Sequence, residues 1–162
     1  MPRKPVGTYN RPTPDWYNQQ AAFSSGQANS GGPGGVSVSL YNDSAQGEYL
    51  WLYYFRADVS GDQQLYAQSF EGVTGSVFTS GYPLVAGRPT PRGTVYAGET
   101  PSAADLVNQP LTWEGTDGFS PEWQTGSPIV GLPPGFSFCV YNGFAAAALI
   151  VNFMWVVLPA TT

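Results

Sequence analysis

Catalytic chemistry in this chain would have to rest on carboxylates, because the residues that usually act as bases, nucleophiles and metal ligands are almost absent. The sequence contains no histidine, one cysteine (Cys139) and one lysine (Lys4). Without histidine, a serine triad lacks its base and the common zinc and haem sites lack a ligand. A lone cysteine cannot form a disulfide within the chain. The sequence therefore predicts no catalytic residue, no metal site and no cofactor.

The remaining candidates for chemistry are three acids beside two tryptophans. Glu114, Asp117 and Glu122 lie in the same stretch of sequence as Trp113 and Trp123. Two carboxylates suffice for glycoside hydrolysis, and aromatic rings beside polar groups suit sugar binding. The stretch is rich in Gly and Pro, however, where acidic side chains ordinarily solvate a turn. We predict that the chain is not an enzyme and keep Trp113 and Trp123 as an alternative glycan-binding site.

Three further features have simpler interpretations than a functional site. Residues 58–62 offer two carboxylates for calcium but lack the spacing of an EF-hand loop, so they favour a hairpin turn. Arg88 and Arg92 share one proline-stiffened loop, which favours a salt bridge or a contact between subunits over a phosphate site. Cys139 alternates with Ser137 in a strand-like segment and has no base beside it, so we expect a packed, inert thiol.

Composition predicts a single all-β domain. The 162 residues include 24 aromatic residues and 35 Gly and Pro residues, and only 10% are charged, against about 25% in an ordinary soluble domain. Short strands joined by Gly and Pro turns explain this composition best, in a jelly-roll-like β-sandwich. The net charge of -5 argues against general binding of nucleic acid.

The hydrophobic pattern predicts eight or nine strands between residues 36 and 159. Alternating or continuous apolar segments bounded by turn residues define them. One helical turn is possible at residues 102–107. The expected strands are residues 36–41, 49–55, 65–70, 75–79, 94–97, 110–113, 127–130, 136–141 and 147–158.

Residues 1–35 read as an extended arm ahead of a sandwich domain at residues 36–162. Four prolines in the first fourteen residues and a Gly-rich hinge at residues 30–35 disfavour regular pairing. The arm carries a net charge of +2 and the remainder -7, so we expect the arm to contact an acidic surface. Aromatic residues are unusual in a linker, and we predict that four of them anchor the arm to a partner; the alternative is that they pack back onto their own domain. These are Tyr9, Trp16, Tyr17 and Phe23.

Two strands are apolar on both faces and predict an oligomer. The odd positions of residues 147–158 are uniformly apolar and should face the core, but most even positions are apolar too. Residues 49–55 behave in the same way, and a strand of this kind is covered on both sides. We predict a homo-oligomer, with a trimer as the expected form, whose interface includes Leu50, Leu52, Tyr54, Ile150 and Met154. The apolar run at residues 144–159 is shorter than the roughly 20 residues of a spanning helix, so no membrane partner is expected.

Several segments of the predicted sandwich resemble jelly-roll decoration or cement proteins of tailed-bacteriophage capsids. They are residues 39–44 (Ser-Leu-Tyr-Asn-Asp-Ser), residues 129–136 (Ile-Val-Gly-Leu-Pro-Pro-Gly-Phe), the Ala-rich residues 145–148 and a closing strand with Trp155. The resemblance implies a trimeric knob on the capsid surface of a virion made in the host cytoplasm. It also implies that the arm reaches over the major capsid protein. The alternative is a carbohydrate- or receptor-binding head fibre or tail module.

Overall fold

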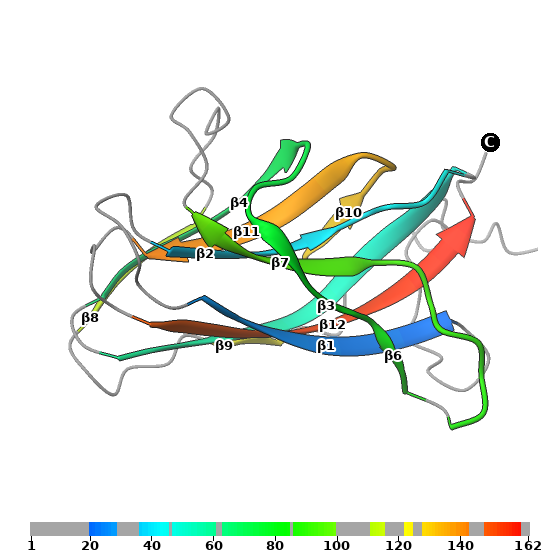
Figure 1. Ribbon diagram of the computed structural model, residues 1–162, viewed down its shortest axis with the longest axis horizontal. Coiled ribbons are helices and arrows are strands. Elements are labelled where there is room, and N and C mark those ends of the chain that lie inside the picture. Colours follow the sequence, from blue (N-terminus) through cyan, green and yellow to red (C-terminus); the bar gives the residue numbers. More distant parts are fainter. Residues whose placement is uncertain are drawn as a thin grey trace, which may run out of the picture.

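The chain folds as a sandwich of two β-sheets. The computed structural model describes residues 20–28, 36–45, 47–60, 63–84, 86–99, 111–115, 122–124, 128–142 and 148–159. Within these ranges there are twelve strands and no helix, and hence no helix that could span a membrane. All strand pairs are antiparallel, and the two sheets pack face to face (Figure 1). The expected all-β sandwich is confirmed, whereas the helical turn at residues 102–107 lies outside the described residues.

Among the described residues, each sheet contains six strands. Sheet A has the order β10 (Val130–Leu132), β3 (Glu48–Val59), β12 (Leu149–Pro159), β1 (Gln20–Ala28) and β6 (Tyr82–Pro83), with β9 (Glu122–Gln124) also paired to β3. Sheet B has the order β5 (Ser76–Ser80), β7 (Thr94–Glu99), β2 (Val36–Tyr41), β11 (Phe136–Asn142), β4 (Gln63–Glu71) and β8 (Leu111–Gly115). Every strand expected from the hydrophobic pattern is present within a few residues. The structure adds β1, β6 and β9.

The strand order is that of a jelly roll. The segment β5–β6–β7 forms an insertion that extends both sheets at one edge. Without it, the strands fall into the two interleaved groups β1, β12, β3, β9/β10 and β2, β11, β4, β8. Most consecutive strands therefore lie in opposite sheets, while β4 and β8 are neighbours in sheet B, as in the double Greek key of a jelly roll. Residues 60–62 accordingly join β3 in sheet A to β4 in sheet B. The expected hairpin turn at residues 58–62 is wrong, because the segment crosses between sheets.

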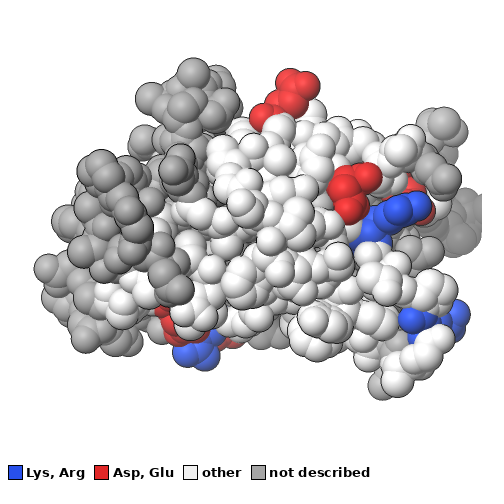
Figure 2. All heavy atoms as spheres, in the orientation of Figure 1, with Lys and Arg blue, Asp and Glu red and all other residues white. Residues whose placement is uncertain are grey.

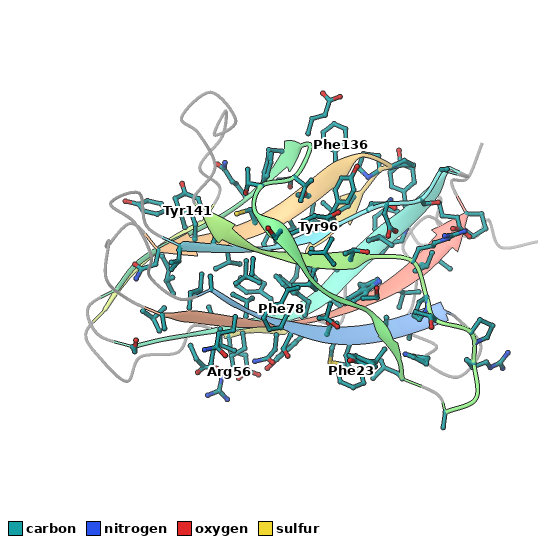
Figure 3. The ribbon with its side chains drawn as sticks, in the orientation of Figure 1. Phe23, Arg56, Phe78, Tyr96, Phe136 and Tyr141 are labelled. Atoms are coloured by element: carbon teal, nitrogen blue, oxygen red, sulfur yellow. The ribbon has the colours of Figure 1, made fainter. Side chains whose placement is uncertain are left out.

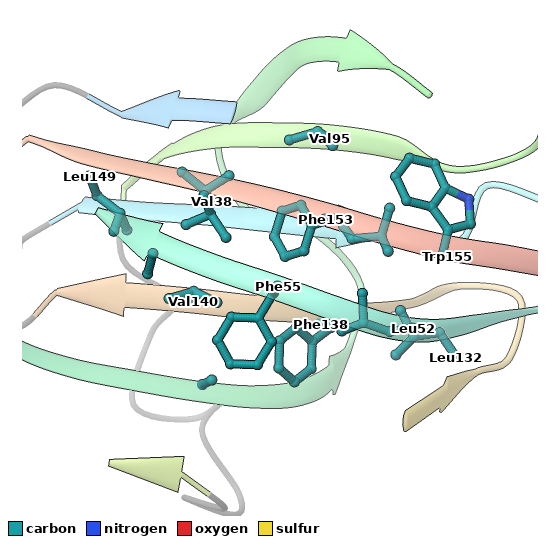
Figure 4. Packing of buried hydrophobic residues seen from close by; sticks show 14 of the residues in the cluster. Val38, Leu52, Phe55, Val95, Leu132, Phe138, Val140, Leu149, Phe153 and Trp155 are labelled. Atoms are coloured by element: carbon teal, nitrogen blue, oxygen red, sulfur yellow. The ribbon is translucent and has the colours of Figure 1, made fainter. Parts of the chain in front are cut away.

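Large apolar side chains from both sheets meet in one core (Figure 4). The odd positions of β12 point inward, as the sequence predicted, and Trp155 is completely buried. Phe55 of sheet A packs against Phe138 of sheet B, with 5.3 Å between ring centroids. Burial of these aromatic and aliphatic groups is the main stabilising term for a chain of this size.

In the described part of the chain, strand pairing is present from Gln20 onward, so the expected start at Val36 is wrong. Residues 20–28, placed in the arm by the sequence analysis, form β1, which pairs along its whole length with β12. Its inward positions hold only small residues, from Ala22 to Ala28. A Cβ atom at Gly26 would lie 2.4 Å from Val38 Cγ1. The two sheets therefore approach closely here, and small residues are required in place of the large apolar ones that mark other strands.

A β-bulge in β3 explains why two expected interface residues lie in the core. The register with β12 shifts between Met154, which pairs with Tyr54, and Trp155, which pairs with Leu52. Tyr53 is left as the extra residue, so side chains before and after it follow opposite parity. Leu50 and Leu52 consequently point inward and are fully buried, which contradicts their assignment to an oligomer interface.

Candidate partner-binding face

The outer face of sheet A carries exposed aromatic and aliphatic side chains. Phe23 on β1 is 45% exposed, Tyr82 on β6 is 56% exposed and Ile150 on β12 is 38% exposed. Register places Phe23 beside both Tyr82 and Met154, and Met154 beside Tyr54. Figure 3 shows Phe23 projecting from β1 on the side away from sheet B. These residues form one surface across β6, β1, β12 and β3, which we call the sheet A face.

A hollow of about 300 Å³ lies in the sheet A face. Phe23 and Tyr82 form a tilted ring pair at one side, with 5.8 Å between centroids. Leu84 is held there because its backbone N–H donates to the Ala21 carbonyl at 3.0 Å. The hollow is lined by Phe23, Ser24, Tyr54, Leu84, Asn152, Phe153 and Met154. Apolar lining with a few polar groups is typical of a binding site.

Charge is sparse around this hollow and gathers at one end. None of the described residues that line it is charged. Arg56 and Asp58 form an ion pair with 3.0 Å between Nη2 and Oδ1. Burial raises the pKa of the Tyr54 hydroxyl, the nearby Glu122 and Asp58 carboxylates raise it further, and Arg56 opposes them. Two carboxylates and one guanidinium therefore leave this end of the face slightly acidic. Figure 2 shows few charged side chains on the part of the surface in view.

Part of the same face is already covered by the chain itself. Ala21, Tyr53 and Val156 are buried there and pack with partly buried neighbours that include Leu84. Burial raises the pKa of the Tyr53 hydroxyl to about 12. Val156 occupies one of the even, outward positions of β12 and is nevertheless completely buried. Contacts within the chain therefore account for this apolar outward residue, without a partner subunit.

The expected anchor and interface residues have different outcomes. Phe23 lies in a strand of the sandwich and lines the hollow, so it belongs to the domain and not to an arm. The other three expected anchors, Tyr9, Trp16 and Tyr17, lie outside the described residues. Tyr54, Ile150 and Met154 share the sheet A face, as the interface prediction requires, but their role in self-association stays a prediction.

Two residues of this face, Tyr82 and Leu84, were not predicted from the sequence. They follow Gly81 in a segment with no apolar alternation, and β6 contains only two residues. Their position depends on pairing with β1, 59 residues earlier at Phe23 and Tyr82. No local pattern in the sequence signals such a long-range contact.

The alternative glycan site draws no support from the strand arrangement. Trp113 is in β8 of sheet B and pairs with Leu65, whereas Trp123 is in β9 of sheet A and pairs with Phe55. The tryptophans thus belong to different sheets, and their side chains lie outside the described residues. Glu122 is exposed, and Asp117 lies outside the description. In the described part of the chain, no three His, Cys, Asp or Glu side chains gather where they could hold a metal ion.

Cys139 lies in the middle of sheet B and is fully buried. Burial raises the pKa of its thiol to about 12, although the nearby Ser39 and Ser37 hydroxyls oppose the rise. The thiol therefore stays protonated at neutral pH. This environment supports the expectation of an inert side chain.

Alkylation should separate the native from the unfolded thiol. We expect native protein at pH 8 to resist iodoacetamide, while denaturant makes Cys139 react quickly. Because the folded pKa lies above the ordinary value of 9.0, this group stabilises the fold below about pH 9 and loses that contribution as the pH rises toward 12. A Cys139→Ala variant should lose this alkaline dependence, measured by urea unfolding at pH 7 and pH 10. Rapid native labelling would contradict the buried position.

The loop with Arg88 and Arg92 is tied to the sandwich. Arg92 Nε lies 3.9 Å from Glu48 Oε2, a salt bridge of the kind expected, and both side chains are partly exposed. The Arg92 carbonyl accepts a hydrogen bond from Trp155 Nε1 at 2.8 Å. Asp43 accepts from the Gly93 N–H at 3.1 Å. These contacts indicate a structural role for the loop.

Comparisons with known proteins do not assign the chain to a family. No family model matches the chain, and no curated protein matches it. Among solved structures, the chain is similar to the crystal structure of the Yersinia pseudotuberculosis-derived mitogen. The identity is 9% and the TM-score 0.26, over 89% of this chain and 90% of that one. A likeness this weak supports no inference about function.

Proposed function

We propose that this chain is a non-enzymatic structural protein of a virus particle, a decoration or cement subunit that binds the major capsid protein on the outside of the head. The observation that carries the proposal is the exposed aromatic sheet A face on a jelly roll. Exposed apolar patches on a well-packed domain are typical of protein interaction sites. A subunit of this kind acts by binding alone, which agrees with the absence of histidine and the buried thiol.

Self-association belongs to the same proposal. The chain forms a closed homo-oligomer, a trimer, in which the sheet A face of each copy contributes Tyr54, Ile150 and Met154 to the contact. Several N-terminal segments in one oligomer then reach neighbouring capsid subunits together. Such multivalent attachment is strong even where each single contact is weak.

Attachment to particles tests the proposal. Particles that lack this protein are incubated with intact chain or with a variant lacking residues 1–18, which leaves β1 complete, and bound protein is measured by co-sedimentation. We expect the intact chain to be retained and the shortened chain to be retained at least tenfold less. Equal retention would show that the N-terminal segment is passive. Absence of any retention would contradict the capsid role.

A further inference from the structure

The hollow in the sheet A face has the chemistry of a groove that binds a proline-rich segment. Its walls are aromatic and aliphatic, with Phe23 and Tyr82 as an exposed ring pair on one side and Tyr54 contributing to the lining. Ser24, Tyr54 and Asn152 are the lining residues whose side chains carry polar groups. Extended segments containing proline dock in aromatic-lined grooves of this kind, because their conformation is largely formed before binding.

The chain itself contains a segment that fits this chemistry. Residues 12–17 read Pro-Thr-Pro-Asp-Trp-Tyr and follow Arg11. The prolines favour an extended conformation, and an aromatic ring next to them supplies a large apolar group for a small hollow. Arg11 suits the slightly acidic end of the face, where Glu122 on β9 lies opposite Arg56 and Asp58 follows two residues later on β3.

We propose that the hollow in the sheet A face binds residues 12–17 of a second copy of the chain. The inference rests on the self-association proposed above and names the contact that drives it. Trp16 enters the hollow beside Phe23 and Tyr82, and the prolines lie along the Tyr54 side.

The direction of β1 favours a second copy over the same chain. The strand starts at Gln20, opposite Val157, and lines the hollow at Phe23, opposite Met154. Three residues of strand span about 10 Å, so a chain entering β1 comes from a point beyond the hollow. To fill its own hollow, Trp16 would have to reverse direction within the few residues before Gln20. A neighbouring copy reaches the hollow without such a reversal.

Peptide binding tests the contact itself. The receptor is the full chain with Trp16→Ala, which removes the competing anchor, and the probe is a fluorescent peptide of residues 10–19. We expect saturable binding, weakened at least tenfold when Phe23→Ala is added to the receptor. Phe78→Ala is the matched control, because Phe78 is 50% exposed but lies on β5 of the opposite sheet. Its change should be less than twofold. Absence of saturable binding, or equal losses in both receptors, would overturn the proposal.

Mixing two full-length variants tests whether the contact joins separate copies. Trp16→Ala keeps the hollow but lacks the anchor, whereas Asn152→Trp keeps the anchor and fills the hollow. Sedimentation velocity should show mainly monomer for each variant alone and a one-to-one complex in the mixture. If the mixture stays monomeric while the peptide binds, each hollow is filled by its own chain and the proposal is wrong. Both results are independent of capsid binding, so the particle experiment can fail while this inference stands.

Discussion

Removing residues 1–34 should abolish folding, because the deletion takes away a central strand of sheet A. All nine residues of β1 pair with β12, and β6 pairs with β1 on its other side. Without β1, the backbone groups along one edge of β12 lose their partners, and the inner surface at Val38 and Val95 loses its cover. Unmade hydrogen bonds and exposed core on this scale exceed the 5–15 kcal/mol that ordinarily stabilises a domain.

The matched control is deletion of residues 1–18, which stops short of β1. We expect this shorter variant to keep the thermal unfolding midpoint of the intact chain within a few degrees, while the longer deletion shows no cooperative transition. Near-ultraviolet circular dichroism provides a second measurement, since the buried aromatic residues give signals only when they are packed. A cooperative transition in the variant lacking residues 1–34 would mean that sheet A is stable without β1.

A comparison of β12 with β1 shows why one strand could be predicted from the sequence and the other could not. In β12, large apolar residues such as Phe153 and Trp155 alternate in the sequence and fill the core, so the pattern predicted both the strand and its inward face. In β1, the inward residues are small because the opposite sheet lies close to Gly26. Small residues do not produce the alternation of large apolar side chains by which a strand is recognised. The prolines before residues 20–28 and the glycines after them therefore led to the prediction of an extended arm. The tertiary contact that requires these residues is not visible locally.

The bulge in β3 likewise limited the prediction of which side chains of this strand point into the core and which point outward. The residues around the bulge, Leu52, Tyr53, Tyr54 and Phe55, are all large and apolar or aromatic. The change in which side chains point inward therefore cannot be detected from the alternation of apolar and polar residues. Strict alternation placed Leu50, Leu52 and Tyr54 on one face, whereas the shift in register separates Tyr54 from the other two. The sequence thus identified a two-sided strand but could not tell which residues remained available for a partner.

The sheet A face was partly predictable for a related reason. Ile150 and Met154 follow from the period of β12, which the sequence defines well. Tyr82 joins the face only through strand β6 of the β5–β6–β7 insertion, where it pairs with Phe23 on a strand far away in the sequence. A site formed by such non-local pairing depends on topology, which composition and local periodicity do not determine.

Replacing Trp155 with alanine should cost about 3–5 kcal/mol of folding free energy, as for other large aromatic residues in a core. The side chain is completely buried, and its indole N–H donates to the Arg92 carbonyl at 2.8 Å. Gly81 and Gly93 lie against the ring so closely that a Cβ atom on them would come within 2.4 Å and 2.9 Å of it. The surroundings are thus shaped around the indole, and Trp155→Ala leaves a cavity that these backbone segments cannot fill.

Thermal and urea unfolding measure the effect, with two variants as controls. In a domain of this size each kcal/mol lowers Tm by about 2–4 °C, so we expect Trp155→Ala to lower it by roughly 6–20 °C. Trp155→Phe keeps part of the ring volume but removes the indole N–H, and its loss should be smaller. Trp51→Ala removes the same side chain from the outer face, where Trp51 is only partly buried, and should also cost less. If Trp155→Ala left Tm unchanged, or if Trp51→Ala cost more, the assignment of Trp155 to the core would be wrong.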